Sequence, residues 1–269
     1  MRHSLLPTAL LCLSLNLPTA RAEQAPERDT LFQLSTIDAL LAGVYQPLAT
    51  LDAVLTQGNF GLGTFVGLDG ELILLDGIVY QAGADGRVRI MPGETATPFI
   101  SLTWFEADQS LPVPPNQDYA AFKDWLQAQL PSRNLTYAIQ LKGQFAHVRY
   151  RSVPAQQPPY PPLKEVAKQQ TFFERDTISG TLIGFWCPDY VTGLNVPGFH
   201  LHFLSDDRQS AGHLLNFQLT EGEVALDLTD RWTVEMPEDP AFLAADLDTD
   251  RSRALHQVEQ APDSQKAQK

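Results

Sequence analysis

Three Asp-Gly pairs stand close together in the first half of the chain, and they constrain how this region can fold. The pairs are Asp69-Gly70, Asp76-Gly77 and Asp85-Gly86, and short β-type runs separate them. Asp-Gly supplies the residues with positive φ that tight hairpin turns require. Residues 58–89 are therefore predicted to form an antiparallel meander, in which each strand pairs with the next one.

A few short helices are predicted around the meander and later in the chain. Residues 35–45 place their apolar side chains on one helical face. Asp118 is expected to cap a second helix, which ends at Pro131. Further helical segments are expected at 164–169 and from Pro240 onward. None of these segments is long, so helices are expected to be the minor component.

The rest of the chain is again rich in β-type sequence. Residues 137–153 are predicted to form a pair of strands that turn at Lys142-Gly143. Later strands are expected at 180–186, 198–204, 213–219 and 223–228. Mixed and antiparallel sheets with a few short helices make the expected fold class α+β, with two β-rich halves.

A proline-rich stretch is the best candidate for the boundary between the two halves. Residues 154–162 hold five prolines in nine positions, which favours an extended crossing rather than a helix or a strand. The expected organisation is an N-terminal α/β domain at 23–153. A C-terminal, β-rich domain with a polar tail then covers 154–269.

Residues 1–22 have the pattern of a signal peptide. Arg2 precedes an apolar run at 5–15, and Ala20-Arg21-Ala22 places small residues where a signal peptidase reads them. The apolar run is too short for a stable membrane span. We expect an exported protein, periplasmic or secreted, whose mature form begins near Glu23 and has no membrane anchor.

The charge of the chain excludes several kinds of partner. Its formal net charge is −13 at pH 7. Nucleic acids and anionic membrane surfaces would be repelled by such a chain, so neither is expected as a partner. A small molecule is the expected partner instead.

Three of the six histidines fall in one short window and are the strongest candidates for a metal site. In Phe199-His200-Leu201-His202-Phe203 the histidines alternate with apolar residues, so on a strand both point to the same face. Polar or small residues at 205–212 predict a hairpin loop that brings His213 opposite His202. Three imidazoles with an open fourth position form the protein side of a catalytic zinc site.

Two other interpretations of these histidines remain open at this point. A cupin-like metal oxygenase or isomerase also carries His-x-His on a strand, but Asp206 rather than Glu follows the pair here, and no second cupin motif is visible. An exported zinc-binding or carrier protein would use the same ligands without catalysis. Such a carrier should fill the coordination of its metal with protein ligands. The sequence offers no obvious fourth ligand, which favours an enzyme.

Three charged residues are further candidates. Glu71 opens a strand after Leu68-Asp69-Gly70, and Arg151 ends a strand beside the prolines; the pattern alone would make both of them surface charges. Glu259 lies in the polar tail, where chains usually fray. Leu255 and Val258 give this last segment an apolar face with which to dock. Removal of the tail after Ala254 is expected to cost little stability.

Several ordered blocks over nearly the whole chain resemble the alpha-acetolactate decarboxylase family. The blocks are Gly61-Leu-Gly-Thr-Phe65, Leu68-Asp-Gly-Glu-Leu72, Tyr137-Ala-Ile139, Arg151-Ser-Val153, Pro159-Tyr160, and Gly198-Phe-His-Leu-His-Phe203 followed by Gly212-His213. The resemblance implies a two-domain fold with mixed sheets, commonly dimeric. It also implies decarboxylation of 2-acetolactate to (R)-acetoin, with zinc and no organic cofactor. Many members lack the export signal that is expected here.

The resemblance also implies roles for individual residues. The zinc ligands of the family correspond to His200, His202 and His213, and its active-site threonine, glutamate and arginine to Thr64, Glu71 and Arg151. A second glutamate, from the C-terminal tail, corresponds to Glu259. In this scheme Arg151 would hold the departing carboxylate in a forked pair, and a glutamate would protonate the enediolate that loss of CO₂ leaves.

Overall fold

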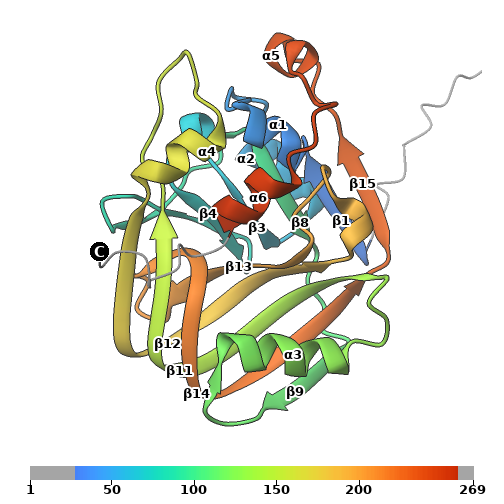
Figure 1. Cartoon of the computed structure of the whole chain (residues 1–269). Helices are drawn as coiled ribbons and strands as arrows, with labels where there is room; N and C mark the ends of the chain where they lie inside the picture. Colours follow the sequence, from blue (N-terminus) through green and yellow to red (C-terminus); the bar gives the residue numbers. More distant parts are fainter. Residues whose placement is uncertain (1–27, 260–269) are drawn as a thin grey trace, which may run out of the picture.

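Two β-sheets form most of the part of the chain that the computed structural model describes, residues 28–259, and short helices lie against them (Figure 1). The expected α+β class is confirmed. The predicted leader lies outside the described residues. Within 28–259 we find no helix of sufficient length and apolar character to cross a membrane.

The first sheet has seven strands. In spatial order they are β15 (Arg231–Glu235), β1 (Thr30–Leu34), β8 (Phe99–Thr103), β3 (Phe60–Thr64), β4 (Glu71–Leu75), β5 (Ile78–Ala82) and β6 (Val88–Ile90). Strands β3 to β6 are consecutive, antiparallel neighbours, so the predicted meander is confirmed. The turn between β4 and β5 uses Asp76 and Gly77, with φ values of 53° and 77°. Strands β1 and β15 pair in parallel, so the sheet is mixed.

The second sheet is built from three long strands and shorter neighbours. In spatial order they are β10 (Gln117–Asp118), β14 (Ala211–Thr229), β11 (Thr136–Ser152), β12 (Thr171–Cys187) and β13 (Gly198–Ser205), while β9 (Gln109–Val113) also pairs with β14. All of these pairings are antiparallel. A separate small ladder joins β2 (Ala49–Thr50) to β7 (Ala96–Thr97).

The helices are short, as predicted. They are α1 (Ile37–Ala42), α2 (Leu51–Val54), α3 (Tyr119–Gln129), α4 (Leu163–Val166), α5 (Pro240–Ala244) and α6 (Ser252–Glu259). The Asp118 carboxylate caps α3 by accepting a hydrogen bond from the Ala121 N–H at 2.8 Å. Figure 1 shows α3 against the second sheet, whereas α1, α4 and α6 gather on the opposite side of the molecule, near the ends of β3 and β4.

The predicted turn at Lys142-Gly143 is wrong, because β11 continues through it as one strand. Gly143 pairs with Gly180 of β12 on one side and with Gly222 of β14 on the other. A Cβ added at Gly143 would lie 2.7 Å from the Leu219 side chain and 2.8 Å from a neighbouring carbonyl oxygen. The glycines therefore allow three backbones to pass closely where the long strands curve (Figure 1). For the same reason the predicted strands 213–219 and 223–228 are both parts of β14.

The sheets do not follow the expected division of the chain at residue 153. Strand β11 precedes this point but belongs to the second sheet, and β15 follows it but pairs with β1 in the first sheet. The division into two domains at that boundary stays a prediction.

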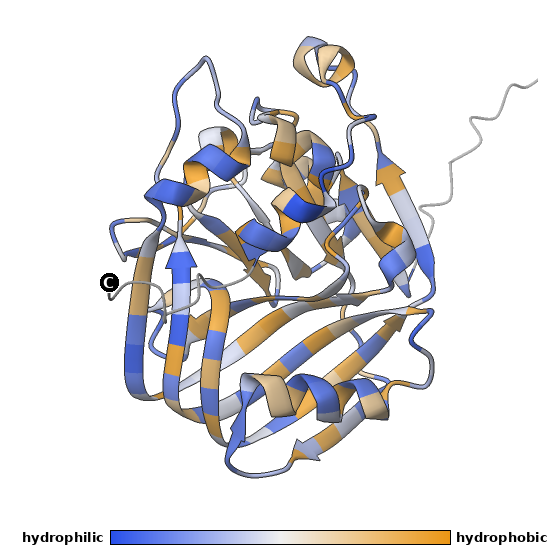
Figure 2. Ribbon diagram, viewed as in Figure 1, coloured by the Kyte–Doolittle hydropathy of each residue, from blue (hydrophilic) through white to orange (hydrophobic). Residues whose placement is uncertain are grey.

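Hydrophobic side chains fill the space between the two sheets and beneath the helices. Bands of hydrophobic and hydrophilic residues alternate along the long strands (Figure 2), as expected where one face of a sheet is buried. Phe122 and Leu126 of α3 pack on the outer face of the second sheet. Phe60 and Ile73 of the first sheet meet Phe185 of the second. A further cluster joins α1, α4 and α6 over the site described below.

One carboxylate is buried among this packing. Asp227 of β14 is 1% exposed; its Oδ2 accepts a hydrogen bond from the Glu106 N–H at 3.1 Å, whereas its Oδ1 has no partner among the described residues. Burial raises the pKa of this carboxyl to about 7, and the Glu106 N–H only partly offsets this effect. The negative charge of Asp108 raises it as well.

We therefore expect Asp227→Asn to change how stability depends on pH. Between about pH 4 and pH 7 the folded protein binds this proton and the unfolded chain does not, so wild-type stability falls as the pH rises through this window. Asparagine stays neutral, and the variant should gain thermal stability relative to wild type as the pH rises. Thermal melts from pH 4 to 8 check this, with the exposed Asp230→Asn as control. A difference in melting temperature that is independent of pH would contradict the expectation.

Candidate metal centre and active site

The three candidate histidines converge on one point. Strand β13 contributes His200 and His202, and His202 pairs directly with His213 of β14. Their ligand nitrogens all lie within 4.8 Å of one another, and the three residues are 8%, 1% and 3% exposed. The predicted hairpin placement is therefore confirmed. Among residues 28–259 no other His, Cys, Asp or Glu brings a ligand atom into this group.

The surroundings of the histidines suit a metal ion. His202 Nδ1 lies 2.9 Å from the Leu72 carbonyl oxygen of β4, so Nδ1 carries the proton and Nε2 offers a lone pair. Nε2 is buried without a hydrogen-bond partner among the described residues. Burial lowers the pKa of His200 to about 3, and it lowers the pKa of His202 and His213 well below the ordinary value. Neutral imidazoles are the form that binds metals.

An ion pair lies beside the histidines. Thr64 and Glu71 face one another across β3 and β4. Glu71 Oε1 accepts a hydrogen bond from an Arg151 Nη at 2.7 Å, and Glu71 Oε2 lies 3.7 Å from His202 Nε2. The Thr64 hydroxyl donates to the Gly70 carbonyl oxygen at 2.7 Å, which ties the start of β4 to β3.

Helix α6 brings the tail glutamate to the same place. Glu259 Oε2 lies 3.5 Å from His213 Nε2 and 3.8 Å from His200 Nε2, while Oε1 lies 4.0 Å from Arg151. The second Arg151 Nη donates to the Val258 carbonyl oxygen at 3.2 Å. The tail segment up to Glu259 is thus part of the site.

The apolar side of α6 corrects one expectation about the tail. Leu255 and Val258 are 5% and 3% exposed and pack with α1 and α4. Burial of an aliphatic side chain contributes about 1.5–3 kcal/mol. Truncation after Ala254 would remove both residues, so it should lower stability substantially rather than slightly.

The two carboxylates have raised pKa values. Burial raises the pKa of Glu71 and of Glu259 to about 7 in each case, and the positive charge of Arg151 opposes the shift. In addition, the Glu259 charge raises the pKa of Glu71. A bound divalent cation would lower both values. Such carboxyl groups can hold or release a proton near neutral pH.

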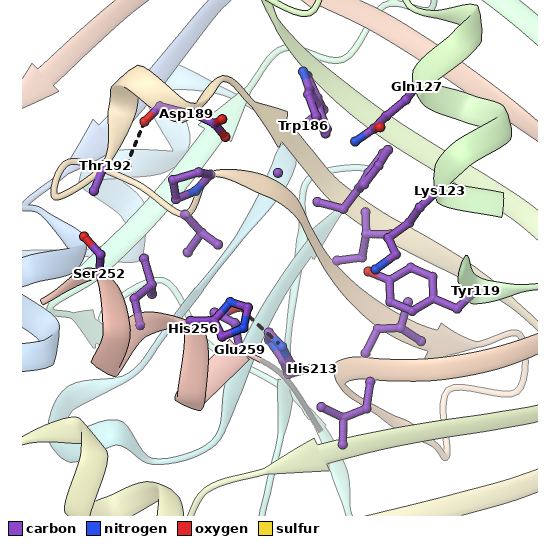
Figure 3. Close-up of a pocket in the computed structure, with 18 of the residues that line it drawn as sticks. Tyr119, Lys123, Gln127, Trp186, Asp189, Thr192, His213, Ser252, His256 and Glu259 are labelled. Atoms are coloured by element: carbon purple, nitrogen blue, oxygen red, sulfur yellow. Dashed lines mark hydrogen bonds and ion pairs between the residues drawn. The ribbon is translucent and has the colours of Figure 1, made fainter. Parts of the chain in front are cut away.

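Two cavities meet at the histidines. A small inner cavity of about 40 Å³ is lined by the polar site residues and by apolar side chains from α1, α4 and α6. A groove of about 730 Å³ runs along α3, the start of β13 and α6 (Figure 3). Of the residues that the structure describes, His213 and Glu259 alone line both cavities. The groove therefore leads to the metal centre.

Sequence reasoning missed two parts of this site. The Leu72 carbonyl group is a backbone atom, so no side-chain pattern could reveal its contact with His202. The sequence predicted α3 as a capped helix but did not indicate that one of its faces lines a groove. Tyr119, Lys123 and Gln127 recur at intervals of four residues, which places them on one face of the helix. This spacing was the one feature of the sequence from which a shared face of these three residues could have been predicted.

Comparisons with known proteins agree with the site. The family model described as "Alpha-acetolactate decarboxylase" matches residues 31–249. A protein of that name from Methanosarcina mazei is 43% identical over 86% of this chain and 80% of its own length. One from Methylococcus capsulatus is 42% identical over 87% and 90%. The crystal structure of alpha-acetolactate decarboxylase from Bacillus subtilis strain 168 superposes with a TM-score of 0.84, at 34% identity over 87% of this chain and all of that one.

These matches define the class of protein as an enzyme, a carboxy-lyase. The chain belongs to the alpha-acetolactate decarboxylase family. The cupin-like alternative is therefore set aside. The matched segment ends at residue 249, so the position of Glu259 at the site comes from the structure.

We expect the purified protein to contain about one divalent metal ion per chain. His202→Ala should lose most of this metal, because it removes the ligand that the Leu72 carbonyl group orients. Elemental analysis by mass spectrometry measures the content. His147→Ala is the matched control, since His147 lies at the surface and pairs with Asp176. Full metal content in His202→Ala would show that the three histidines do not form the site.

Proposed function

We propose that the protein converts 2-acetolactate to (R)-acetoin and CO₂, with one zinc ion held by His200, His202 and His213. The observation that carries the proposal is the convergence of three neutral imidazoles with Glu71, Arg151 and Glu259 in a member of this family. The three nitrogen ligands suit zinc.

The metal would supply one part of the chemistry. When bound, zinc acts as a Lewis acid and stabilises negative charge on the ketone and hydroxyl oxygens of the substrate. A non-catalytic zinc carrier would surround the ion with protein ligands. The family supports an enzyme over a carrier, because the relatives are named as decarboxylases.

Arg151 has two contacts within the protein in addition to the forked carboxylate clamp that the resemblance implies for it. One of its terminal nitrogens donates to Glu71 and the other to the Val258 carbonyl oxygen. Its Nε is buried without a partner among the described residues. We propose that Arg151 holds Glu71 and α6 in position through these two hydrogen bonds, and that its remaining N–H groups, the unpartnered Nε–H among them, are offered to the substrate carboxylate.

Glu259 is the proposed proton donor. Loss of CO₂ breaks the bond between the carboxylate and the carbinol carbon, and the electron pair remains in an enediolate. A carboxylic acid must then deliver a proton to that carbon to complete acetoin. Glu259 comes from α6 on one side of the histidines and has a raised pKa. Delivery from one side yields a single enantiomer.

The direct test is a turnover assay. Metal-loaded protein should consume racemic 2-acetolactate and release CO₂ and (R)-acetoin, measured by gas chromatography on a chiral column. Removal of the metal with a chelator should abolish the activity, and added zinc should restore it. Absence of acetoin from the zinc-loaded protein would refute the proposal.

We also propose that the enzyme acts outside the cytoplasm, in the periplasm or the medium. The support is the signal-peptide pattern of residues 1–22.

We expect Glu259→Gln to keep the fold and the metal and to slow acetoin formation by roughly a hundredfold or more, the usual effect of losing a general acid. Steady-state kinetics, thermal melts and metal analysis check the three parts. Glu238→Gln, at an exposed position, is the matched control. If Glu259→Gln turns over at the parental rate, the proton comes from Glu71 or from water.

We expect Arg151→Lys to retain the metal but lose most of the activity. A lysine ammonium keeps the charge, yet it lacks the planar fork that reaches both Glu71 and the Val258 carbonyl group. Turnover and metal content are measured on the same preparation. Wild-type turnover would show that catalysis does not need the two hydrogen bonds from Arg151 to Glu71 and to the Val258 carbonyl group.

A further inference from the structure

The inner cavity is too small to receive a substrate unaided. Its volume of about 40 Å³ corresponds to roughly three water molecules, at ~10–15 Å³ each. The groove is far larger and shares His213 and Glu259 with the inner cavity. A substrate from solution therefore passes through the groove on its way to the metal centre.

One wall of the groove is a face of α3. Tyr119, Lys123 and Gln127 are four residues apart, so they lie on one side of the helix and line the groove. Phe122 and Leu126, on the other side, are fully buried and fix the helix to the second sheet. Figure 3 shows Lys123 and Tyr119 projecting from α3 into the space that His213 and Glu259 border from the far side.

Lys123 is an uncompensated cation in this wall. Its Nζ lies 4.6 Å from the centre of the Tyr119 ring, and it forms no ion pair with any residue of the described part of the chain. The aromatic face restrains the ammonium group but leaves its charge unneutralised. Lys123 is half-buried, whereas Asp124 and Asp189, which also line the groove, are exposed, so that solvent and salt screen their charges.

The other basic residues around the groove are less suited to capture an anion. Arg151 lines the inner cavity rather than the groove, and it already donates to Glu71 and to the Val258 carbonyl oxygen. Arg133 lines the groove but is exposed to solvent, 5.9 Å from the Trp186 ring centre. An entering carboxylate therefore meets Lys123 as a half-buried cation of the groove that has no ion-pair partner among the described residues.

We infer that Lys123 is a positioning residue: it binds the carboxylate of the incoming 2-hydroxy acid in the groove and directs it to the metal centre. The net charge of −13 repels an anionic substrate at long range, so a local cation on the path increases productive encounters. The identity of the substrate rests on the function proposed above, whereas the capture of a carboxylate rests on the groove itself.

The test compares Lys123→Gln, Lys123→Arg and the parent. Lys123→Gln should lower kcat/KM for acetolactate roughly five- to tenfold through KM, with kcat within about twofold and a weaker dependence of kcat/KM on salt. Lys123→Arg should restore most of the loss, because the charge is kept. Lys142→Gln, an exposed position away from the groove, should match the parent. Unchanged kcat/KM in Lys123→Gln, or a loss confined to kcat, would overturn the inference.

A binding measurement separates this inference from the proposed function. The probe is 2-hydroxyisobutyrate, a carboxylate with a tertiary hydroxyl group that does not decarboxylate, titrated calorimetrically into metal-loaded protein. Lys123→Gln should weaken its affinity several-fold. If the parent makes no acetoin but the variant still binds the probe more weakly, the proposed function is refuted, whereas the binding of a carboxylate by Lys123 is supported. If acetoin forms and both proteins bind the probe equally, the role inferred for Lys123 is refuted and the proposed function is not affected.

Discussion

The buried guanidinium group of Arg151 joins the parts of the molecule on which the site depends. It sits near the end of β11 in the second sheet, donates to Glu71 at the start of β4 in the first sheet, and donates to the backbone of α6 at Val258. Three segments distant in sequence thus meet at one side chain. Removal of a partner from such a buried pair leaves an uncompensated charge, which is costly. The position of the tail glutamate is therefore coupled to the contact between the two sheets.

The balance of charges around Arg151, together with burial, accounts for the protonation of the ionisable groups in the site. Glu71 and Glu259 face one buried cation, and the three imidazoles are held neutral by burial. One arginine does not fully stabilise two buried carboxylates, so their pKa values rise to about 7. A divalent cation among the histidines would supply the missing positive charge. The same surroundings thus favour metal binding, and a bound metal would in turn lower the pKa of both carboxyl groups.

The architecture explains why the site is rigid on one side and open on the other. The histidines stand on paired strands, and the carbonyl group of Leu72, from the other sheet, orients His202. Glu259 stands instead on a short helix that packs on α1 and α4 through Leu255 and Val258. Between this helix and α3 lies the groove, in which Lys123 faces the metal centre (Figure 3). Rigid strands thus hold the metal ligands, and surface helices form the access route.

The sequence by itself determined the features that depend on neighbouring residues. Asp76-Gly77 encodes a hairpin turn, Asp118 encodes a helix cap, and the alternation around His200 and His202 places both rings on one face. Local conformational preference and the period of two residues along a strand are sufficient for these features. Pairings between distant segments were decided only by the tertiary structure. Lys142-Gly143 is a residue pair typical of a turn, yet Gly143 lies within a long strand because it pairs with Gly180 on one side and with Gly222 on the other. In the same way Arg151, Glu71 and Glu259 look like surface charges in the sequence, because burial and partners arise only when the sheets and α6 pack together.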